Sequence, residues 1–255
     1  MVCLVDPVVP DRARASESGS LLSPLPSAVR DGVLDNPAWH AMTGPQRHVS
    51  EVRGHAARYQ SGVSVFHALR DERDERAWAD LAALVGPGAE LVLTGASPTP
   101  PAGWTVLGAV AGVQMVATHL EARPDDEAVR LTEADVPEAL DLVARTEPGP
   151  FSSRTIELGA YLGIRREGRL VAMAGERMHP PGWTEISAVC TDPAHRGEGL
   201  ASRLVRAVAH GITARGDRVL LHAAASNSAA IALYERLGFA LRRRPEFVAL
   251  RSPAT

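Results

Sequence analysis

The chain has 255 residues, of which 45% are hydrophobic and 22% are charged, and its formal net charge is −3. These values are typical of a globular protein, and the length suits one large domain or two smaller ones. A charge so close to neutral gives no support to nucleic acid or an anionic membrane as a partner. All 27 basic residues are arginine, because the sequence contains no lysine.

The first 28 residues have the composition of a tail. They contain several prolines and a Ser-Glu-Ser-Gly-Ser run, which predicts a flexible segment over residues 1–28. Their start lacks the basic residues and long hydrophobic core of a signal peptide. The apolar run 106–117 is shorter than the ~20 residues of a membrane span. We therefore expect a cytoplasmic protein, in which Cys3 and Cys190 form no disulfide.

Residues 29–122 predict a small α/β domain. Asn36-Pro37 is typical of a capped helix start, and a helical stripe containing Trp78 and Leu81 ends at Gly86. Apolar runs that suit strands follow at residues 91–93, 104–107 and 113–116. His40, His48, His55 and His67 of this region lack the spacing of metal ligands, so no metal is expected.

A linker over residues 123–128 precedes a second domain, residues 129–255. Thr132 and Asp135 form a variant of the capping box, and the helix they begin is expected to bury Val136, Leu140, Val143 and Ala144. Residues 159–165 and 170–178 predict a hairpin around a glycine-containing turn. A third strand, residues 185–191, completes a meander and is expected to place Ile186, Ala188 and Cys190 on one face.

This third strand ends in a glycine-rich turn, Asp192 to Gly199, that leads into a helix with Leu200, Leu204, Val208 and Ile212 on one stripe. The first N–H groups of a helix have no partner within the helix, and a glycine beside them lets a ligand come close. Such a helix start suits an anionic ligand such as a diphosphate. The same pattern also occurs in plain strand-to-helix turns. A P-loop is excluded, because no Lys-Ser/Thr pair follows, and Asp217 lies before the next strand rather than after it, which disfavours a dinucleotide site.

Two blocks together are more specific than the turn. Arg196-x-x-Gly199-x-Ala201 resembles motif A of the GNAT N-acetyltransferases, and residues 227–239, Asn-Ser-Ala-Ala-Ile-Ala-Leu-Tyr-Glu-Arg-Leu-Gly-Phe, resemble their second conserved block. The resemblance covers residues 129–251 and is tighter to the FR47-like subgroup, similar to the C-terminal half of glycine acyltransferases. It implies an α/β (α+β) GNAT fold: a mixed, mostly antiparallel twisted sheet flanked by helices, with residues 29–122 as a degenerate GNAT-like copy.

The resemblance also implies an acyl donor, acetyl-CoA (coenzyme A), and residues that would bind it. The pantetheine arm would pair along the third strand, with a backbone N–H near Val189 as oxyanion donor, and Asn227 would bind the same arm. Tyr234 would protonate the departing sulfur. The implied cofactor-binding residues are Val189, Cys190, Thr191, Arg196, Gly197, Glu198, Gly199, Leu200, Ala201, Ser202, Asn227 and Tyr234. Cys190 is expected to be a core residue rather than a nucleophile.

The acceptor side is less determined. Glu185 ranks first as general base, with Glu176 or a water chain as alternatives, although Glu185 also fits an ordinary exposed carboxylate at a strand end. Phe151 and Arg154, in the loop before the hairpin, are candidates for holding the acceptor. Arg154 would do so by pairing with a carboxylate of the acceptor. We expect an N-acetyltransferase acting on a small amine or amino acid. A protein acetyltransferase, a coenzyme A-binding regulatory module without turnover, and a homodimer all stay open.

Overall fold

The structure is a computed structural model that describes residues 32–95 and 99–254. The predicted tail, residues 1–28, and Cys3 within it lie outside the described residues. None of the helices in the described part is long and apolar enough to cross a membrane.

Five α-helices and twelve strands make up the described chain. The helices are α1 (Pro37–Thr43), α2 (Glu75–Val85), α3 (Val136–Thr146), α4 (Leu200–Ala214) and α5 (Ser228–Arg236). The strands are β1 (Ser50–Arg53), β2 (Ala56–Tyr59), β3 (Phe66–Leu69), β4 (Glu90–Gly95), β5 (Thr105–Ala117), β6 (Val129–Arg130), β7 (Tyr161–Arg166), β8 (Arg169–Glu176), β9 (Trp183–Thr191), β10 (Arg218–Ala224), β11 (Phe239–Arg243) and β12 (Glu246–Arg251). Short 3-10 turns include η1 (Gly32–Asp35), η4 (Thr155–Leu158) and η5 (Pro193–His195).

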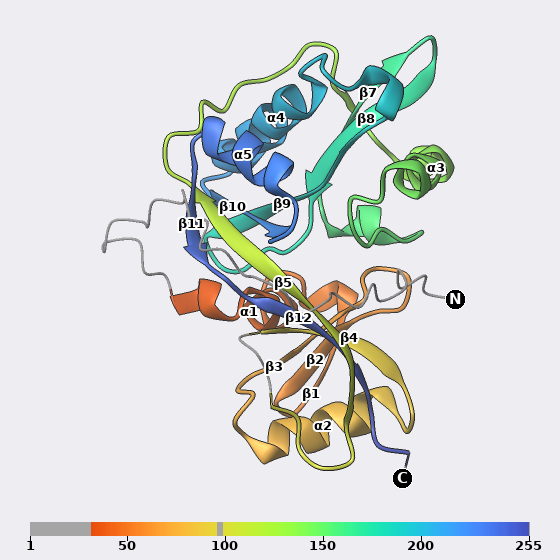
Figure 1. Cartoon of the computed structure of the whole chain (residues 1–255), viewed down its shortest axis with the longest axis vertical. Helices are drawn as coiled ribbons and strands as arrows, with labels where there is room; N and C mark the ends of the chain where they lie inside the picture. Colours follow the sequence, from red (N-terminus) through yellow and green to blue (C-terminus); the bar gives the residue numbers. More distant parts are fainter. Residues whose placement is uncertain (1–31, 96–98, 255) are drawn as a thin grey trace, which may run out of the picture.

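All strands join one mixed sheet in the order β1-β2-β3-β4-β12-β5-β10-β9-β8-β7-β6, with β11 pairing β5 in addition. Strand β5 runs through both halves of the molecule (Figure 1). Its first part pairs β12, and its second part lies between β10 and β11. The sequence predicted two short strands here, but a single strand of 13 residues forms because partners are available along its whole length.

The N-terminal half repeats the order of elements of the C-terminal half. A hairpin (β1–β2), an antiparallel third strand (β3), a helix (α2) and a strand parallel to the third (β4) correspond to β7–β8, β9, α4 and β10. This order supports the expected degenerate copy. Strands β5 and β12 each pair across the two halves, and the division at residues 123–128 stays a prediction.

Two apolar layers cover the faces of the C-terminal sheet. On one face the predicted stripe of α4, from Leu200 to Ile212, is buried against the sheet together with residues of α5. On the other face lies α3, whose buried residues are Val136, Ala139 and Leu142. Of the predicted stripe of α3, Val136 is buried and Val143 packs against this cluster, whereas Leu140 is only partly buried and Ala144 is exposed. The capping box is confirmed, since the Asp135 carboxylate accepts from the Thr132 N–H at 2.8 Å.

Candidate active site

Strands β9 and β10 diverge in the middle of the sheet. Residues 183–186 of β9 pair in parallel with residues 218–221 of β10, and the pairing stops after Ile186 and Leu221. Beyond that point β9 continues on β8 and β10 continues on β5. A gap therefore opens between two neighbouring parallel strands, with unpaired backbone edges on both sides.

A β-bulge in β9 lies beside this gap. Ala188 has a φ of 52°, and the register with β8 jumps between Ser187, which faces Gly175, and Cys190, which faces Met173. The extra residue reverses the alternation of side chains. Ile186 packs on the α4 side, whereas Ala188 and Cys190 pack on the α3 side. The prediction that these three residues share one face was wrong, because simple alternation does not foresee a bulge.

The glycine-rich turn follows at the end of β9. Asp192 caps η5 by accepting from the Ala194 N–H at 3.0 Å, and Gly197 and Gly199 take φ values of 88° and 75°. Among the described residues, the N–H groups of Gly197–Ser202 donate to no backbone carbonyl. A Cβ placed on either glycine would meet nothing within 4 Å, so the space above the turn is open. The predicted residues from Arg196 to Ser202 thus meet at the start of α4, and Leu200 offers only its backbone, because its side chain is in the core.

Thr191, the last residue of β9, has a buried hydroxyl with no hydrogen-bond partner. It alternates with Val189, which packs on the α4 side, so its side chain belongs to the same face as the turn. A buried polar group without a partner is costly, and such groups commonly await a ligand or a water. The glycine turn and the end of β9 together form a cradle, which offers the N–H groups of residues 197–202 and the Thr191 hydroxyl to an incoming ligand.

Asn227 immediately precedes α5, and Tyr234 lies near the end of this helix, on the same side of the sheet as the glycine turn. The Asn227 carbonyl oxygen caps α5 by accepting from the Ala230 N–H at 3.1 Å, which leaves its NH₂ group available. The Tyr234 ring is buried against Phe239 at 5.9 Å between centroids. Burial raises the pKa of Tyr234 to about 12. This phenol therefore keeps its proton across the physiological range.

Glu185 occupies the closed end of the gap and is not the exposed strand-end carboxylate considered from the sequence. Its side chain is 0% exposed. Arg177 donates to both of its oxygens, at 2.9 and 2.5 Å, and His222 Nδ1 and the Met178 N–H lie at 2.6 and 3.3 Å. Burial alone would raise the pKa of Glu185, but the charges of Arg177 and His222 outweigh it and hold this pKa well below its usual range.

Four donors fill the four lone-pair sites of a carboxylate. Proton abstraction by Glu185 would require one donor to leave, and a lowered pKa makes this carboxylate a weak base. Glu176, the second candidate, is also buried and accepts from Arg215 at 2.8 Å. The geometry therefore favours the water chain among the three bases considered from the sequence.

Three residues of this network were not found by sequence analysis: Arg177, His222 and Gln114. The Gln114 amide is oriented by two partners, since its NH₂ donates to the Leu34 carbonyl at 2.9 Å and its oxygen accepts from Arg242 at 2.8 Å. The same NH₂ lies 3.1 Å from His222 Nε2. The His222 ring is thereby positioned by Gln114 at Nε2 and by Glu185 at Nδ1. No local pattern could indicate this, because the partners come from η1, β5, the connection after β8, β9, β10 and β11.

The loop before β7 is fixed to the N-terminal half. Arg154 pairs bidentately with Glu157, at 2.7 and 2.8 Å, and also donates to the Ser61 carbonyl at 3.2 Å. Its predicted role in holding an acceptor carboxylate requires the pair with Glu157 to open, and stays a prediction. Phe151 lies edge-on to Tyr161, at 5.5 Å between centroids, on the α3 side of the sheet.

Cys190 is buried on the α3 side of β9. Burial raises the pKa of its thiol to about 11, so the reactive thiolate is scarce at neutral pH. This environment agrees with the expected core role. Within the described residues, no group of three or more His, Cys, Asp or Glu side chains is arranged to hold a metal ion.

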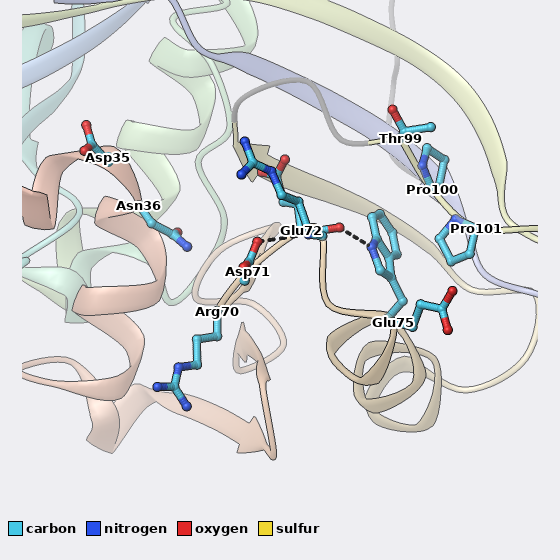
Figure 2. A pocket seen from close by; sticks show the side chains of 11 residues that line it. Asp35, Asn36, Arg70, Asp71, Glu72, Glu75, Thr99, Pro100 and Pro101 are labelled. Atoms are coloured by element: carbon cyan, nitrogen blue, oxygen red, sulfur yellow. Dashed lines mark hydrogen bonds between the residues drawn. The ribbon is translucent and has the colours of Figure 1, made fainter.

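A pocket of about 610 Å³ lies in the N-terminal half, where the chain passes from β3 to α2. Figure 2 shows it between the turn at Arg70–Glu72, Thr99–Pro101 and Asp35–Asn36. The Trp78 indole, which also lines the pocket, donates to the Glu72 carbonyl at 2.8 Å. This position corresponds to the glycine turn of the C-terminal half. Four acidic residues and two arginines line it and no glycine does, so it lacks the glycine-flanked helix start of an anion cradle.

Comparison with known proteins agrees with this geometry. Residues 161–248 match the family model of FR47-like proteins. The chain is 37% identical over 128 residues to the N-alpha-acetyltransferase RimI of Mycobacterium tuberculosis, a match that spans 45% of this chain and 80% of that protein. A solved structure of a GNAT-family protein from Novosphingobium aromaticivorans superposes with a TM-score of 0.80 at 41% identity, over 88% of this chain and 100% of the other.

The chain therefore belongs to the GNAT family of acetyltransferases and is an acyltransferase. Within that family, its C-terminal half is FR47-like. It is also 39% identical over 118 residues to the mycothiol acetyltransferase of Salinispora tropica, although the match spans only 37% of that protein and 42% of this chain. The predicted similarity to glycine acyltransferases stays a prediction.

Proposed function

We propose that the protein transfers the acetyl group of acetyl-CoA directly to the amine of a small molecule or amino acid, in a ternary complex. One observation supports this most: the gap between β9 and β10 leads from the bulge at Ala188 to the open glycine turn. The gap suits an extended arm that pairs with strand edges, and the turn suits a diphosphate. When bound, acetyl-CoA would supply the activated acyl group as a thioester.

The residues that would hold this donor form one continuous track. The N–H groups of residues 197–202 would bind the diphosphate, with Arg196 adding positive charge. The Thr191 hydroxyl and the Asn227 NH₂ would contact the pantetheine arm, along the free edge of Val189–Thr191. The Glu198 carboxylate is unfavourable to a diphosphate, but it lies 2.9 Å from His195 Nδ1 and is held at the imidazole.

Proton transfers are assigned by the state of each group. Tyr234, which remains protonated, would donate to the departing sulfur. A water chain would take the proton of the acceptor amine, because Glu185 is already saturated with donors. Glu185, Arg177 and His222 would instead hold the closed end of the gap rigid. The backbone N–H near Val189 would stabilise the oxyanion.

Enclosure of the acceptor side favours a small acceptor. The loop that contains Phe151 and Arg154 is bonded to residues 61–63 of the N-terminal half, through the Ser61 carbonyl and through the Val63 carbonyl, which accepts from Thr155 at 2.8 Å. A peptide would need a groove open at this place. A peptide acceptor remains an alternative, because one relative is an N-alpha-acetyltransferase. The second alternative is a regulatory module, which would bind acetyl-CoA without turnover.

The test is acyl transfer by Tyr234→Phe, followed as release of free coenzyme A thiol in the presence of amine acceptors. We expect transfer to fall 10²-fold or more, with unchanged affinity for acetyl-CoA. Tyr59→Phe is the matched control, because this tyrosine is equally buried but bonds Gln46 in the N-terminal half at 2.7 Å. A Tyr234→Phe protein as active as the wild type would remove the general-acid role.

The homodimer has a candidate surface at β5. Residues 105–110 pair with β12 on one edge only, and their other edge faces no described strand. This segment is uncharged, and Val110 is 54% exposed, whereas the edge strand β1 contains Glu51 and Arg53. Uncharged, unpaired edges invite strand addition, and a second copy can supply the same edge about a two-fold axis.

Light scattering after size-exclusion chromatography tests this surface. We expect a dimer for the wild type and a monomer for Val110→Lys, because a lysine on the edge blocks pairing. Val129→Lys, at the similarly exposed Val129 of β6, is the matched control and should leave the dimer intact. A monomeric wild type would contradict the proposal.

A further inference from the structure

Tyr161, the first residue of β7, has a buried hydroxyl that makes no hydrogen bond. The residue is 1% exposed, and its phenol is one of four buried side-chain groups without a partner in the described part of the chain. Leaving such a group unpaired is unfavourable, and phenylalanine would fill the same space without this cost. A hydroxyl at this position therefore needs an explanation outside folding.

The ring crosses β8 toward the bulge of β9. Tyr161 faces Gly175 on β8, and Gly175 faces Ser187 on β9, next to Ala188. A Cβ on Gly175 would overlap Cγ, Cδ1 and Cε1 of the ring, so glycine is required for the ring to lie there. The hydroxyl end is thereby directed across β8 toward β9. Tyr161 packs in one cluster with Ala188 and Cys190, which agrees with this direction.

This hydroxyl lies on the face of the sheet opposite the proposed donor track. The glycine turn, Thr191 and α5 belong to the α4 side, whereas Tyr161 and its neighbour Phe151 belong to the α3 side. If the donor enters the gap from the α4 side, an amine must reach the carbonyl carbon from the other side. The bulge at Ala188 is the place where both sides meet.

We infer that the Tyr161 hydroxyl is a hydrogen-bonding group for the acceptor, accepting an N–H of a neutral amine and orienting its lone pair toward the carbonyl carbon. The inference rests on the proposed function. In the transfer, a bond forms between the amine nitrogen and the carbonyl carbon, and the carbon–sulfur bond breaks. Sulfur receives the proton of Tyr234, and the proton lost from nitrogen passes to water. Tyr161 itself neither gains nor loses a proton.

Burial and charge agree with an orienting rather than a proton-accepting role. Burial raises the pKa of Tyr161, the nearby Arg177 guanidinium lowers it by less, and the phenol stays neutral at all relevant pH values. A neutral phenol offers lone pairs to an N–H and cannot serve as a base. An uncharged primary or secondary amine suits this contact, because it has an N–H to donate to the phenol and keeps a lone pair for attack on the carbonyl carbon.

The experiment compares Phe variants of all three tyrosines of the chain, Tyr59, Tyr161 and Tyr234. Acceptor probes are glycine, glucosamine and a tetrapeptide that begins with alanine, with thiol release as the readout. For Tyr161→Phe we expect kcat/KM for the acceptor to fall roughly tenfold, the effect of one hydrogen bond. Acetyl-CoA affinity should stay unchanged, and the melting temperature should stay equal or rise.

The combination of lower transfer and undiminished stability separates an acceptor contact from a structural role. Tyr59→Phe should behave in the opposite way, with a lower melting temperature and normal transfer, because its hydroxyl is paired. Transfer by Tyr161→Phe equal to that of the wild type overturns the inference alone. Absence of transfer in every protein, the wild type included, overturns the proposed function and the inference with it.

Discussion

Replacing Glu185 with glutamine removes one charge from a buried ion pair and leaves the other in place. Arg177 and Glu185 side chains are 10% and 0% exposed, and the guanidinium also lies 4.9 Å from the Phe66 ring centroid. Breaking a buried pair by removing one partner costs about 3–5 kcal/mol, against a total stability of about 5–15 kcal/mol for a typical domain. For a chain of this size each kcal/mol lowers the melting temperature by about 2–4 °C. We expect a loss of roughly 6–20 °C.

Glu157→Gln is the matched control, because Arg154 and Glu157 form an equally bidentate pair whose side chains are 42% and 32% exposed. Such a pair contributes about 0–1 kcal/mol, so its loss should shift melting by only a few degrees. The assay is thermal unfolding of both variants beside the wild type, repeated in urea. Equal shifts for Glu185→Gln and Glu157→Gln would refute the argument that Glu185 holds the closed end of the gap.

Three further outcomes follow from the structure. Cys190→Ser should keep acyl transfer, and Cys190 in the folded protein should resist alkylation at pH 8, because burial raises the pKa of its thiol to about 11. Loss of transfer in Cys190→Ser would instead indicate a covalent mechanism. Burial lowers the pKa of His67 from 6.5 to about 4, so between these pH values the folded state binds fewer protons than the unfolded state. The free energy of unfolding should therefore fall by up to about 3 kcal/mol as pH drops from 6.5 to 4. In urea unfolding, His67→Gln should lack this loss. A chain of residues 123–255 should fail to give a cooperative thermal transition, because β10 and β11 would lose their shared partner β5. A chain of residues 99–255, which contains β5, should unfold cooperatively. Cooperative unfolding of the shorter chain would show that β5 is dispensable.

The elements around the donor track could be predicted from the sequence because their signals are local. The glycine turn, the stripe of α4 and the Asn227 cap each depend on residues within a few positions of one another. The parallel pairing of β9 and β10 agrees with the helix that connects them. The predicted hairpin β7–β8 is confirmed, and its signal is local because only Glu167 and Gly168 join the two strands.

What could not be predicted depends on pairing between distant segments. The bulge at Ala188 is set by the register of β8 against β9, and alternation alone placed Ile186 and Cys190 on the same face. Glu185 looked like an exposed strand end because its partners lie outside β9: Arg177 follows β8, and His222 is on β10. The continuous β5 likewise required β12, which follows it by more than a hundred residues. Tyr161 looked like an ordinary strand residue until its unpaired hydroxyl was seen.

Binding of acetyl-CoA, measured by calorimetric titration of the whole protein, tests the central claim most directly. The wild type should bind with roughly one site per chain, and Gly199→Asp should not, because its carboxylate would face the diphosphate. Gly216→Asp is the control: Gly216 has a φ of 89°, near the 75° of Gly199, and similarly open surroundings, but lies beyond the opposite end of α4. Binding by wild type and Gly216→Asp alone would support the cradle. Equal binding by Gly199→Asp, or none by the wild type, would contradict it.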